Sequence, residues 1–414
     1  MIRITDSRQA AKLLARRATR LKEAEETVRP ILEAVRLRGD KALIEYARRF
    51  DGLDRSTVAI PPAELAAAHK RLSPQFRKAV RMASKNIAGF ARIQLPQARP
   101  AALGPGLRLG QVVLPLDTVA AYIPAGRYPL PSTLMMTAIP AQVAGVKTVC
   151  VATPRPAEAI LGTAWMLKVS AVFQMGGAHA IAAFAYGTRT VPRADRIVGP
   201  GNIYVAAAKK LLAGEVGIDF IAGPTEILII AADGEPAWLA ADMLAQAEHD
   251  VDASAILLTT SSQLAEAVGN EIERQLEDLP TAAVARKALA KNSAIIVVTT
   301  LEEAVELANG FAPEHLSIPD RRLLKQVKHA GSIFVGPHST EAAGDYASGP
   351  NHVLPTSGAA RLRGGLSAAD FVKVISVQEL SPAALARLKP AITTLARAEG
   401  LEAHARSVEV RFRG

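Results

Sequence analysis

The sequence predicts an α/β protein with two successive parallel sheets and helical segments at both ends of the chain. From about residue 112 to residue 335, short apolar runs alternate with segments of helical periodicity, and the alternation occurs in two rounds. Such an order is typical of parallel sheets whose two faces are covered by helices. The length of 414 residues is enough for two or three domains.

Helical segments come first along the chain. Residues 1–50 are expected to be helical because apolar residues recur at helical spacing, with a break at Gly39-Asp40. Pro61-Pro62 starts a further helix and Ser73-Pro74 the next, where serine caps the helix and proline fits the first turn. At the other end, a helix is expected over 382–404 and a strand-like tail over 408–412.

The two rounds of alternation predict individual strands and helices. The first round predicts strands at 118–123, 148–152, 171–175 and 196–198, with helices at 132–144, 157–167, 178–186 and 203–212. The second round predicts strands at 226–231, 255–259, 294–298, 316–318 and 332–335, with helices at 236–249, 263–279, 301–308 and 321–329. Each round is therefore expected to form its own sheet.

Composition excludes several classes of protein. Hydrophobic residues make up 49% and charged residues 21%, values near those of soluble globular proteins, which excludes a disordered chain, collagen and a coiled-coil rod. The single cysteine, Cys150, excludes a disulfide framework and a cysteine-based zinc module. It lies in an apolar run and is expected in the core of a protein from a reducing compartment such as the cytoplasm.

Charge and hydropathy argue against nucleic-acid and membrane partners. The formal net charge of 49 − 39 = +10 is spread along the chain, and aromatic residues, at 4%, are too few for base-stacking platforms. The most apolar stretch, 130–152, is interrupted by Pro131, Pro140 and Lys147 and does not fit a membrane span. We therefore expect a solvated basic surface, which also suits anionic ligands.

Two glycine-rich turns follow predicted strands and precede predicted helices, at 175–180 and 198–202. This arrangement is the usual cradle for a phosphate group. Neither turn fits the dinucleotide fingerprint or the P-loop pattern. The pattern alone leaves open a nucleotide site and a tight turn that needs glycine for backbone reasons.

Polar residues near element ends are candidates for chemistry. Gln246 and His249 lie three residues apart near the end of a predicted helix, so they share a face and could bind one metal ion, unless they are ordinary polar residues of a helix end. Glu314 and His315 lie in a loop before a short strand and offer two bases of different pKa, although a loop glutamate and a surface histidine would look the same.

A long turn-rich segment, 341–355, is almost uncharged and predicts a loop that serves a site. Asp345 in this segment is a candidate oxygen ligand, and His352 is an orienting or core histidine. Glu399 and His404 lie near the end of the last helical region, and the sequence pattern by itself predicts surface positions for both.

Together these segments resemble the histidinol dehydrogenases, a family of zinc- and NAD-dependent enzymes of the last steps of histidine biosynthesis. The match runs through almost the whole chain and is weakest in the first hundred residues. Its specific parts are Tyr122-Ile-Pro, 173–188, 197–205, Ile218-Asp219, 222–226, 245–249, 312–316, 344–355 and the terminal Glu399…His404.

The resemblance implies two incomplete Rossmann-like domains of aldehyde-dehydrogenase type with small helical extensions at both ends. It places an N-terminal extension at 1–23, a first domain with the metal and catalytic residues at 24–115 and 225–370, a second, NAD-side domain at 116–224, and a C-terminal dimerisation tail at 371–414. Each active site would be shared between two subunits of a cytoplasmic homodimer.

The resemblance also assigns roles to single residues. One Zn²⁺ per subunit would be bound by Gln246, His249, Asp345 and His404. Glu314 and His315 would be the catalytic bases. Thr225, Glu399, His315 and the four metal ligands would contact the substrate, L-histidinol. NAD⁺ would be contacted by Tyr122, His179 and Asn202.

Three positions depart from the family pattern: Thr225 is usually serine, His179 is usually glutamine, and Ala125 stands where a second glycine is common. The threonine keeps the hydroxyl and narrows the pocket by a methyl group. Histidine offers one hydrogen bond per ring nitrogen and does not reproduce the pair that an amide makes.

Two other functions stay open on the sequence. A dehydrogenase of the same fold could act on another polyol, such as a sulfopropanediol, although Glu399, which would face the amino-alcohol end, favours histidinol. A metal-binding structural protein without activity would not need Glu314 and His315.

Overall fold

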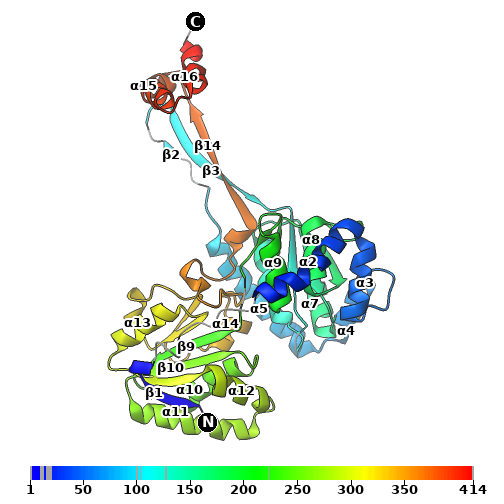
Figure 1. Cartoon of the computed structure of the whole chain (residues 1–414), viewed down its shortest axis with the longest axis vertical. Helices are drawn as coiled ribbons and strands as arrows, with labels where there is room; N and C mark the ends of the chain where they lie inside the picture. The colour runs from blue at the N-terminus through cyan, green and yellow to red at the C-terminus, as the bar shows by residue number, and fades with distance from the viewer. Residues whose placement is uncertain are drawn as a thin grey trace. The chain divides into compact units, whose positions relative to one another are not determined.

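The computed structural model describes residues 2–9, 14, 21–98, 101–102, 104–125, 128–221 and 223–412 (Figure 1). Contacts within the chain divide it into two units, Met1–Gln94 with Leu116–Phe371, and Leu95–Pro115 with Val372–Gly414. The first unit contains both parallel sheets, and the α/β fold class is confirmed. No helix among the described residues has the length and apolarity needed to cross a membrane.

The first sheet has five parallel strands in the order β6-β5-β4-β7-β8. The strands are β4 (Thr118–Tyr122), β5 (Thr148–Thr153), β6 (Ala171–Gln174), β7 (Arg196–Val198) and β8 (Gly217–Ile218), and the helices between them are α6 (Pro131–Val143), α7 (Glu158–Leu167), α8 (Gly177–Tyr186) and α9 (Ile203–Leu212). Apart from the short β8, these elements match the predicted ranges closely, and Cys150 is buried in the core as expected.

The N-terminal helices cover this first sheet. They are α2 (Leu21–Arg38), α3 (Asp40–Asp51), α4 (Pro62–Arg71) and α5 (Pro74–Gln94). Alternate residues of each strand face opposite sides: Ala120 and Tyr122 share a core with α2, α3, α8 and α9, whereas Val119 and Ala121 share one with α4 to α7. Helices α2, α8 and α9 lie side by side (Figure 1).

The expected grouping of residues 24–115 with the metal-side sheet is therefore wrong for the helices α2 to α5. Their apolar faces are buried in the two cores on either side of the first sheet. Residues 95–115 were also expected in the metal-side domain, but they belong to the second unit of the chain.

The second sheet has six parallel strands in the order β1-β11-β10-β9-β12-β13. The strands are β1 (Arg3–Asp6), β9 (Glu226–Ala231), β10 (Ser254–Thr259), β11 (Ala294–Val297), β12 (His315–Ile318) and β13 (Ser332–Val335). The covering helices are α10 (Pro236–Ala247), α11 (Ser262–Asp278), α12 (Ala282–Asn292) and α13 (Leu301–Phe311).

Four local predictions fail around this sheet. The sequence predicts a helix through residues 1–50 and a helical extension at 1–23, but the chain begins with strand β1. This segment pairs as a parallel strand with the free edge of β11. Residues 1, 10–13 and 15–20 lie outside the described part. Helix α12 was not predicted. The helix expected over 321–329 is only a 3-10 turn, Leu323–Lys325. The loop expected from residue 341 begins with a short helix, α14 (Glu341–Tyr346), capped by Thr340.

The second unit consists of a β-ribbon and two helices. Strand β3 (Leu107–Pro115) pairs antiparallel with β14 (Val372–Leu380), and β2 (Ala101–Ala102) pairs with β3. The helices are α15 (Pro382–Ala398) and α16 (Glu402–Glu409), which pack on each other. The predicted strand-like tail at 408–412 is wrong: α16 continues into a 3-10 turn, Val410–Phe412, because this segment packs at helical spacing on α15, with Lys389 over the Phe412 ring.

Candidate active site

A cavity of about 200 Å³ lies within the first unit, and both sheets contribute to its lining. From the second sheet and its connections come Thr225, His249, Glu314, His315, Glu341, Asp345, Tyr346, His352, Val353, Leu354 and Thr356. From the first sheet and its connections come Leu130, Ser132, Thr133, Pro200 and Phe220, with Gly223 in the link between the sheets. The cavity thus has lining residues from both sheets, and Tyr122, His179 and Asn202 are not among them.

The two candidate bases, Glu314 and His315, lie at the start of β12, beside the start of the neighbouring parallel strand β9. Thr225 directly precedes β9 and Glu314 directly precedes β12, and these strands pair with His315 opposite Ile227. The starts of both strands therefore meet at one edge of the second sheet, which is why residues almost ninety positions apart come into contact.

Glu314 is 5% exposed and is held by two hydrogen bonds. Its Oε2 accepts from the Thr225 hydroxyl at 2.5 Å and from the backbone N–H of Glu226 at 2.9 Å. Burial raises the pKa of Glu314, with His315 and the two donors opposing this shift. The carboxylate is thus fixed in orientation and more basic than an exposed glutamate.

His315 is 3% exposed, and its two ring nitrogens have different surroundings. Nδ1 lies 3.2 Å from the Glu226 carbonyl oxygen, which assigns the proton to Nδ1 in the neutral ring. Nε2 has no hydrogen-bond partner among the described residues and lies 3.8 Å from Asp345 Oδ1. The neutral ring thus offers Nε2 as a proton acceptor at the cavity wall.

The charge on His315 is governed by carboxylates. Burial lowers the pKa of His315, but the neighbouring carboxylates, Glu341 first and then Glu314, outweigh burial and raise the pKa to about 10. The shortest distance from Nδ1 to Glu341 Oε1 is 3.5 Å. The carboxylates around the cavity therefore favour the charged form of His315.

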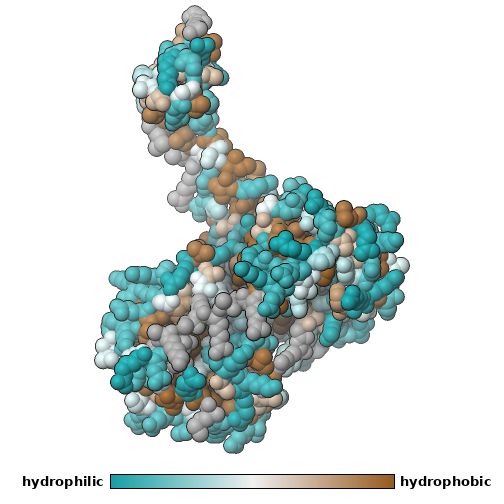
Figure 2. Space-filling view, in the orientation of Figure 1, coloured by the Kyte–Doolittle hydropathy of each residue, from teal (hydrophilic) through white to brown (hydrophobic). Residues whose placement is uncertain are grey.

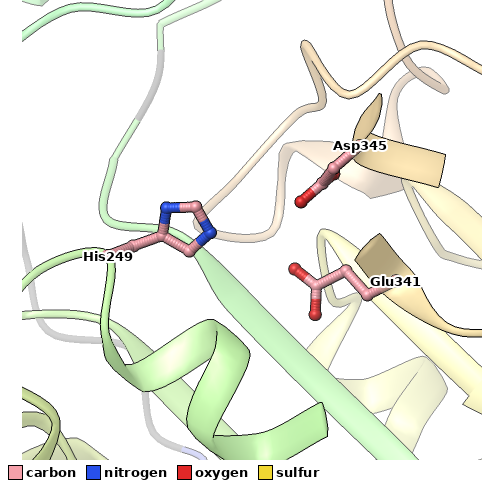
Figure 3. Close-up of side chains that lie close together, drawn as sticks. All are labelled: His249, Glu341 and Asp345. Carbon is pink, nitrogen blue, oxygen red and sulfur yellow. The ribbon is translucent and has the colours of Figure 1, made fainter. Parts of the chain in front are cut away.

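Three donors for a metal ion converge beside His315. One ligand atom from each of His249, Glu341 and Asp345 lies within 4.8 Å of the others; the three side chains point toward a common space in Figure 3. His249 follows the end of α10, while Glu341 and Asp345 lie one turn apart on α14. Nitrogen and oxygen donors without thiolate fit Zn²⁺ and related divalent ions.

Gln246 joins this cluster through its amide. Its side chain is fully buried, and the orientation that satisfies its partners has Nε2 donating to Glu341 Oε1 at 2.5 Å. The amide oxygen then lies 2.7 Å from the Thr225 hydroxyl, whose one hydrogen is donated either to this oxygen or to Glu314 Oε2. Glu341 therefore holds Gln246 in place, and it is the site residue that the sequence analysis missed. An acid at the start of a short helix resembles ordinary helix capping, so no local signal marks it.

The candidate ligand His404 and the candidate substrate contact Glu399 belong to the second unit. Glu399 is the C-cap of α15, and His404 lies on α16; both are exposed. Neither lines the cavity of the first unit.

The three candidate NAD⁺ contacts follow strands of the first sheet, at their carboxyl ends. Tyr122 is 3% exposed, its hydroxyl accepts from the Gly177 N–H at 3.2 Å, and burial raises its pKa to about 12. His179 is 1% exposed, and its Nε2 lies 2.7 Å from Asp51 Oδ2. Asn202 is exposed and caps α9 by accepting from two backbone N–H groups.

The side chains of Tyr122 and His179 thus use their polar atoms for contacts inside the protein. Asp51, at the end of α3, was not considered in the sequence analysis, because its partner lies more than a hundred residues away. Asn202 keeps its amide N–H₂ free of the capping bonds, so among the three it is the side chain best placed for a ligand.

Comparison with known proteins agrees with this geometry. A family model described as histidinol dehydrogenase matches residues 14–412. The chain belongs to the histidinol dehydrogenase family. It is 48% identical to the histidinol dehydrogenase of Synechococcus sp. over 398 residues, covering 94% of this chain and 92% of the relative. It is 45% identical to that of Geobacter sulfurreducens over 414 residues, covering 97% and 96%.

A crystal structure of histidinol dehydrogenase from Elizabethkingia anophelis has the same fold. It superposes with a TM-score of 0.95 at 35% identity, covering 100% of this chain and 98% of that one. Membership in the histidinol dehydrogenase family identifies the chain as an oxidoreductase, and the resemblance stated from the sequence is confirmed.

Proposed function

We propose that this protein oxidises L-histidinol to L-histidine through L-histidinal, with one Zn²⁺ per subunit and two molecules of NAD⁺. The observation that carries the proposal is the pairing of Glu314 and His315 with the donors His249 and Asp345 around one cavity. The first oxidation removes a hydride and the alcohol proton. The second adds water to the aldehyde and removes another hydride and a proton from the hydrate, which leaves the carboxylic acid.

Zn²⁺ would be held by Gln246, His249 and Asp345, with His404 as a fourth ligand from the partner subunit's tail. When bound, the ion serves as a template that orients the substrate's imidazole and amine groups. Thr225, His315 and Glu399 would contact the substrate. The unpartnered Nε2 of His315 and the buried carboxylates support a cation and a polar substrate at this position.

His315 would accept the alcohol proton at Nε2, the nitrogen that faces the cavity without a partner. It must be neutral to do so. The carboxylates that raise its pKa are the same groups that surround the metal position, and a divalent charge there opposes their effect. Metal binding and the protonation of this base are thus expected to be linked.

Glu314 would take a proton from the water that adds to the aldehyde. Burial raises its pKa toward neutrality, where a carboxylate is a better base, and its two hydrogen bonds hold it in one orientation. NAD⁺, when bound, accepts a hydride in each step. Its site is expected at the carboxyl ends of β4, β6 and β7, where Tyr122, His179 and Asn202 lie.

A homodimer would complete each site with the tail of the other subunit. Five apolar side chains of the β3–β14 ribbon are between 40% and 48% exposed: Val112, Leu114, Val374, Ile375 and Val377. Apolar atoms on this ribbon are visible in Figure 2. A ribbon with this much exposed apolar surface is typical of an interface between subunits. The buried, unpaired thiol of Cys150 supports a cytoplasmic location.

The test is the stoichiometry of the reaction. Purified protein with L-histidinol and excess NAD⁺ should form two molecules of NADH for each molecule of L-histidine. A sulfopropanediol should not be oxidised under the same conditions. Oxidation of the sulfopropanediol instead of histidinol would favour the other dehydrogenase, and the absence of NADH with either alcohol would favour a protein without activity.

A further inference from the structure

Helix α6 contains a buried carbonyl group that the helix itself cannot satisfy. Pro140 lies four residues after Met136 within this helix and has no N–H, so the Met136 carbonyl lacks its usual donor. Asn351, which is 8% exposed, supplies the missing donor: its Nδ2 donates to Met136 O at 2.7 Å. A residue far along the chain therefore completes the hydrogen bonding of α6.

The other end of the Asn351 amide is also bound. Its Oδ1 accepts from the Val353 N–H at 2.9 Å. Since a backbone carbonyl only accepts and a backbone N–H only donates, the two partners determine the orientation of the amide. Asn351 thus connects α6 rigidly to the segment in which it lies.

Two neighbouring contacts attach the same segment to the helices of the first sheet. Asn86 on α5 donates from Nδ2 to Ala347 O at 2.8 Å. His352 Nε2 lies 3.2 Å from the Thr133 hydroxyl on α6. The segment 347–353 directly follows α14, which carries Glu341 and Asp345, so it links the metal donors to helices of the opposite half.

These attachments lie between the two walls of the cavity. The first turn of α6, with Ser132 and Thr133, lines the cavity from the side of the first sheet, and Asp345 lines it from the side of the second. His352 reinforces the connection, because its Nδ1 lies 2.8 Å from the Asp345 carbonyl oxygen. The position of α6 relative to α14 therefore sets the width of the cavity.

We propose that Asn351 is a positioning residue, which sets the distance between the two walls of the cavity, α6 on one side and the metal donors of α14 on the other, by holding α6 through the carbonyl that Pro140 leaves free. The inference rests on the proposed function. Hydride transfer is sensitive to displacements of about 1 Å, which can cost on the order of a hundredfold in rate. Substrate binding, which depends on the donors of the second sheet, should be affected much less.

A substitution at Pro140 distinguishes two roles of Asn351: holding α6 in position and supplying a donor to the Met136 carbonyl. In Pro140→Ala, the new N–H can bond to the Met136 carbonyl within the helix. Asn351→Ala alone leaves that carbonyl unsatisfied and should lower the melting temperature by about 4 °C. In the double variant, the helix satisfies its own carbonyl but the Val353 N–H still lacks its acceptor, so the stability should return in part while the link between α6 and segment 347–353 remains absent.

The experiment compares Pro140→Ala with the double variant, at a temperature where circular dichroism shows both folded. Steady-state oxidation of histidinol by NAD⁺ is measured with metal-loaded enzyme. We expect kcat of the double variant to be lower by about tenfold or more, with KM for histidinol within about threefold. Asn309→Ala is the matched control, since Asn309 also donates from Nδ2 to a carbonyl (Gln326 O) and accepts at Oδ1 from a backbone N–H, on α13.

Recovery of the kcat of Pro140→Ala in the double variant would overturn the inference, because it would show that Asn351 only satisfies a carbonyl. An unchanged kcat in Asn351→Ala would overturn it as well. Failure of the proposed function is a separate result: in that case the unmodified protein itself does not reduce NAD⁺ with histidinol.

Discussion

Glu314 and Glu341 are two buried carboxylates that face His315 from different elements. Glu314 Oε2 lies 3.7 Å and Glu341 Oε1 lies 3.5 Å from His315 Nδ1. Their other contacts distinguish them: Glu314 binds Thr225 and the Glu226 backbone, whereas Glu341 binds the Gln246 amide. At the scale of single residues, the contacts of Glu314 fit the proposed proton transfer, and those of Glu341 fit support of a proposed metal ligand.

Glu314→Gln is expected to separate the two oxidations. Glutamine keeps the shape but cannot take a proton from water, so oxidation of histidinal should fall by on the order of a hundredfold. Oxidation of histidinol, served by His315, should fall less. Stopped-flow measurements that start separately from histidinol and histidinal test this division, with the exposed Glu302→Gln on α13 as control. Equal losses in the two steps would reject it.

Glu341→Gln is expected to weaken metal binding. Glutamine keeps an oxygen that can accept from the Gln246 amide, but it removes the negative charge of one of the three converging donors, so metal affinity should fall by about 10- to 100-fold. Elemental analysis after dialysis against a weak chelator gives the metal content. Glu248→Gln is a suitable control, because Glu248 accepts from the Thr281 hydroxyl instead. Full metal retention in Glu341→Gln would show that metal binding does not need the charge of this carboxylate.

Helix α10 carries both a candidate metal ligand and a carboxyl group whose burial lowers the free energy of unfolding. It carries Gln246 near its end, and Asp242 lies one turn earlier on the same face. Burial raises the pKa of Asp242 to about 6. Since the folded pKa is higher than the unfolded value, this carboxyl costs no stability at pH below about 4, and its cost grows as pH rises through about 6.

Asp242→Asn is therefore expected to stabilise the protein at pH 7.5 and to have little effect at pH 4. The gain should be roughly 1 kcal/mol, less than the full shift implies because the side chain is only partly buried. Chelator-treated protein is used, so that bound metal does not contribute, and urea unfolding is measured at both pH values. Asp278→Asn, at the exposed end of α11, is the control. A gain that is the same at both pH values would exclude titration of Asp242 as its cause.

In the whole molecule, the candidate site residues are divided between two units. The first unit contains both sheets and the cavity with the bases and three of the four candidate ligands. The second unit contains the exposed apolar ribbon together with Glu399 and His404. A symmetric dimer would exchange these tails reciprocally, because both subunits present the same surface.

Mixed dimers of two inactive variants test this exchange. His249→Ala and His404→Ala should each be nearly inactive alone. After the two are unfolded and refolded together, about half of the dimers are mixed, and one site in each mixed dimer has no defect. Activity should recover to about a quarter of that of the unmodified protein. With mixed dimers verified by two different tags, no recovery would mean that each tail serves its own subunit.

Local sequence periodicity determined most of the fold. The strand Arg196–Val198 and the helix Ile203–Leu212 occur over the predicted ranges, because the burial of one face is recorded in the spacing of apolar residues. The ribbon strand Val372–Leu380 alternates less clearly, and only its pairing with β3 makes it a strand. Strand β1 likewise depends on the free edge of β11.

For the site, the sequence identified Gln246, His249, Glu314, His315 and Asp345 as candidates, largely through the resemblance to a known family. Only the tertiary structure revealed Glu341 beside His249 and Asp345, and Asp51 beside His179. The physical reason is that periodicity reports whether a side chain is buried, whereas the partner of a buried charge depends on how distant elements pack. The carbonyl left free by Pro140 is visible in the sequence, but its partner Asn351 became known only when α6 and the segment 347–353 were seen together.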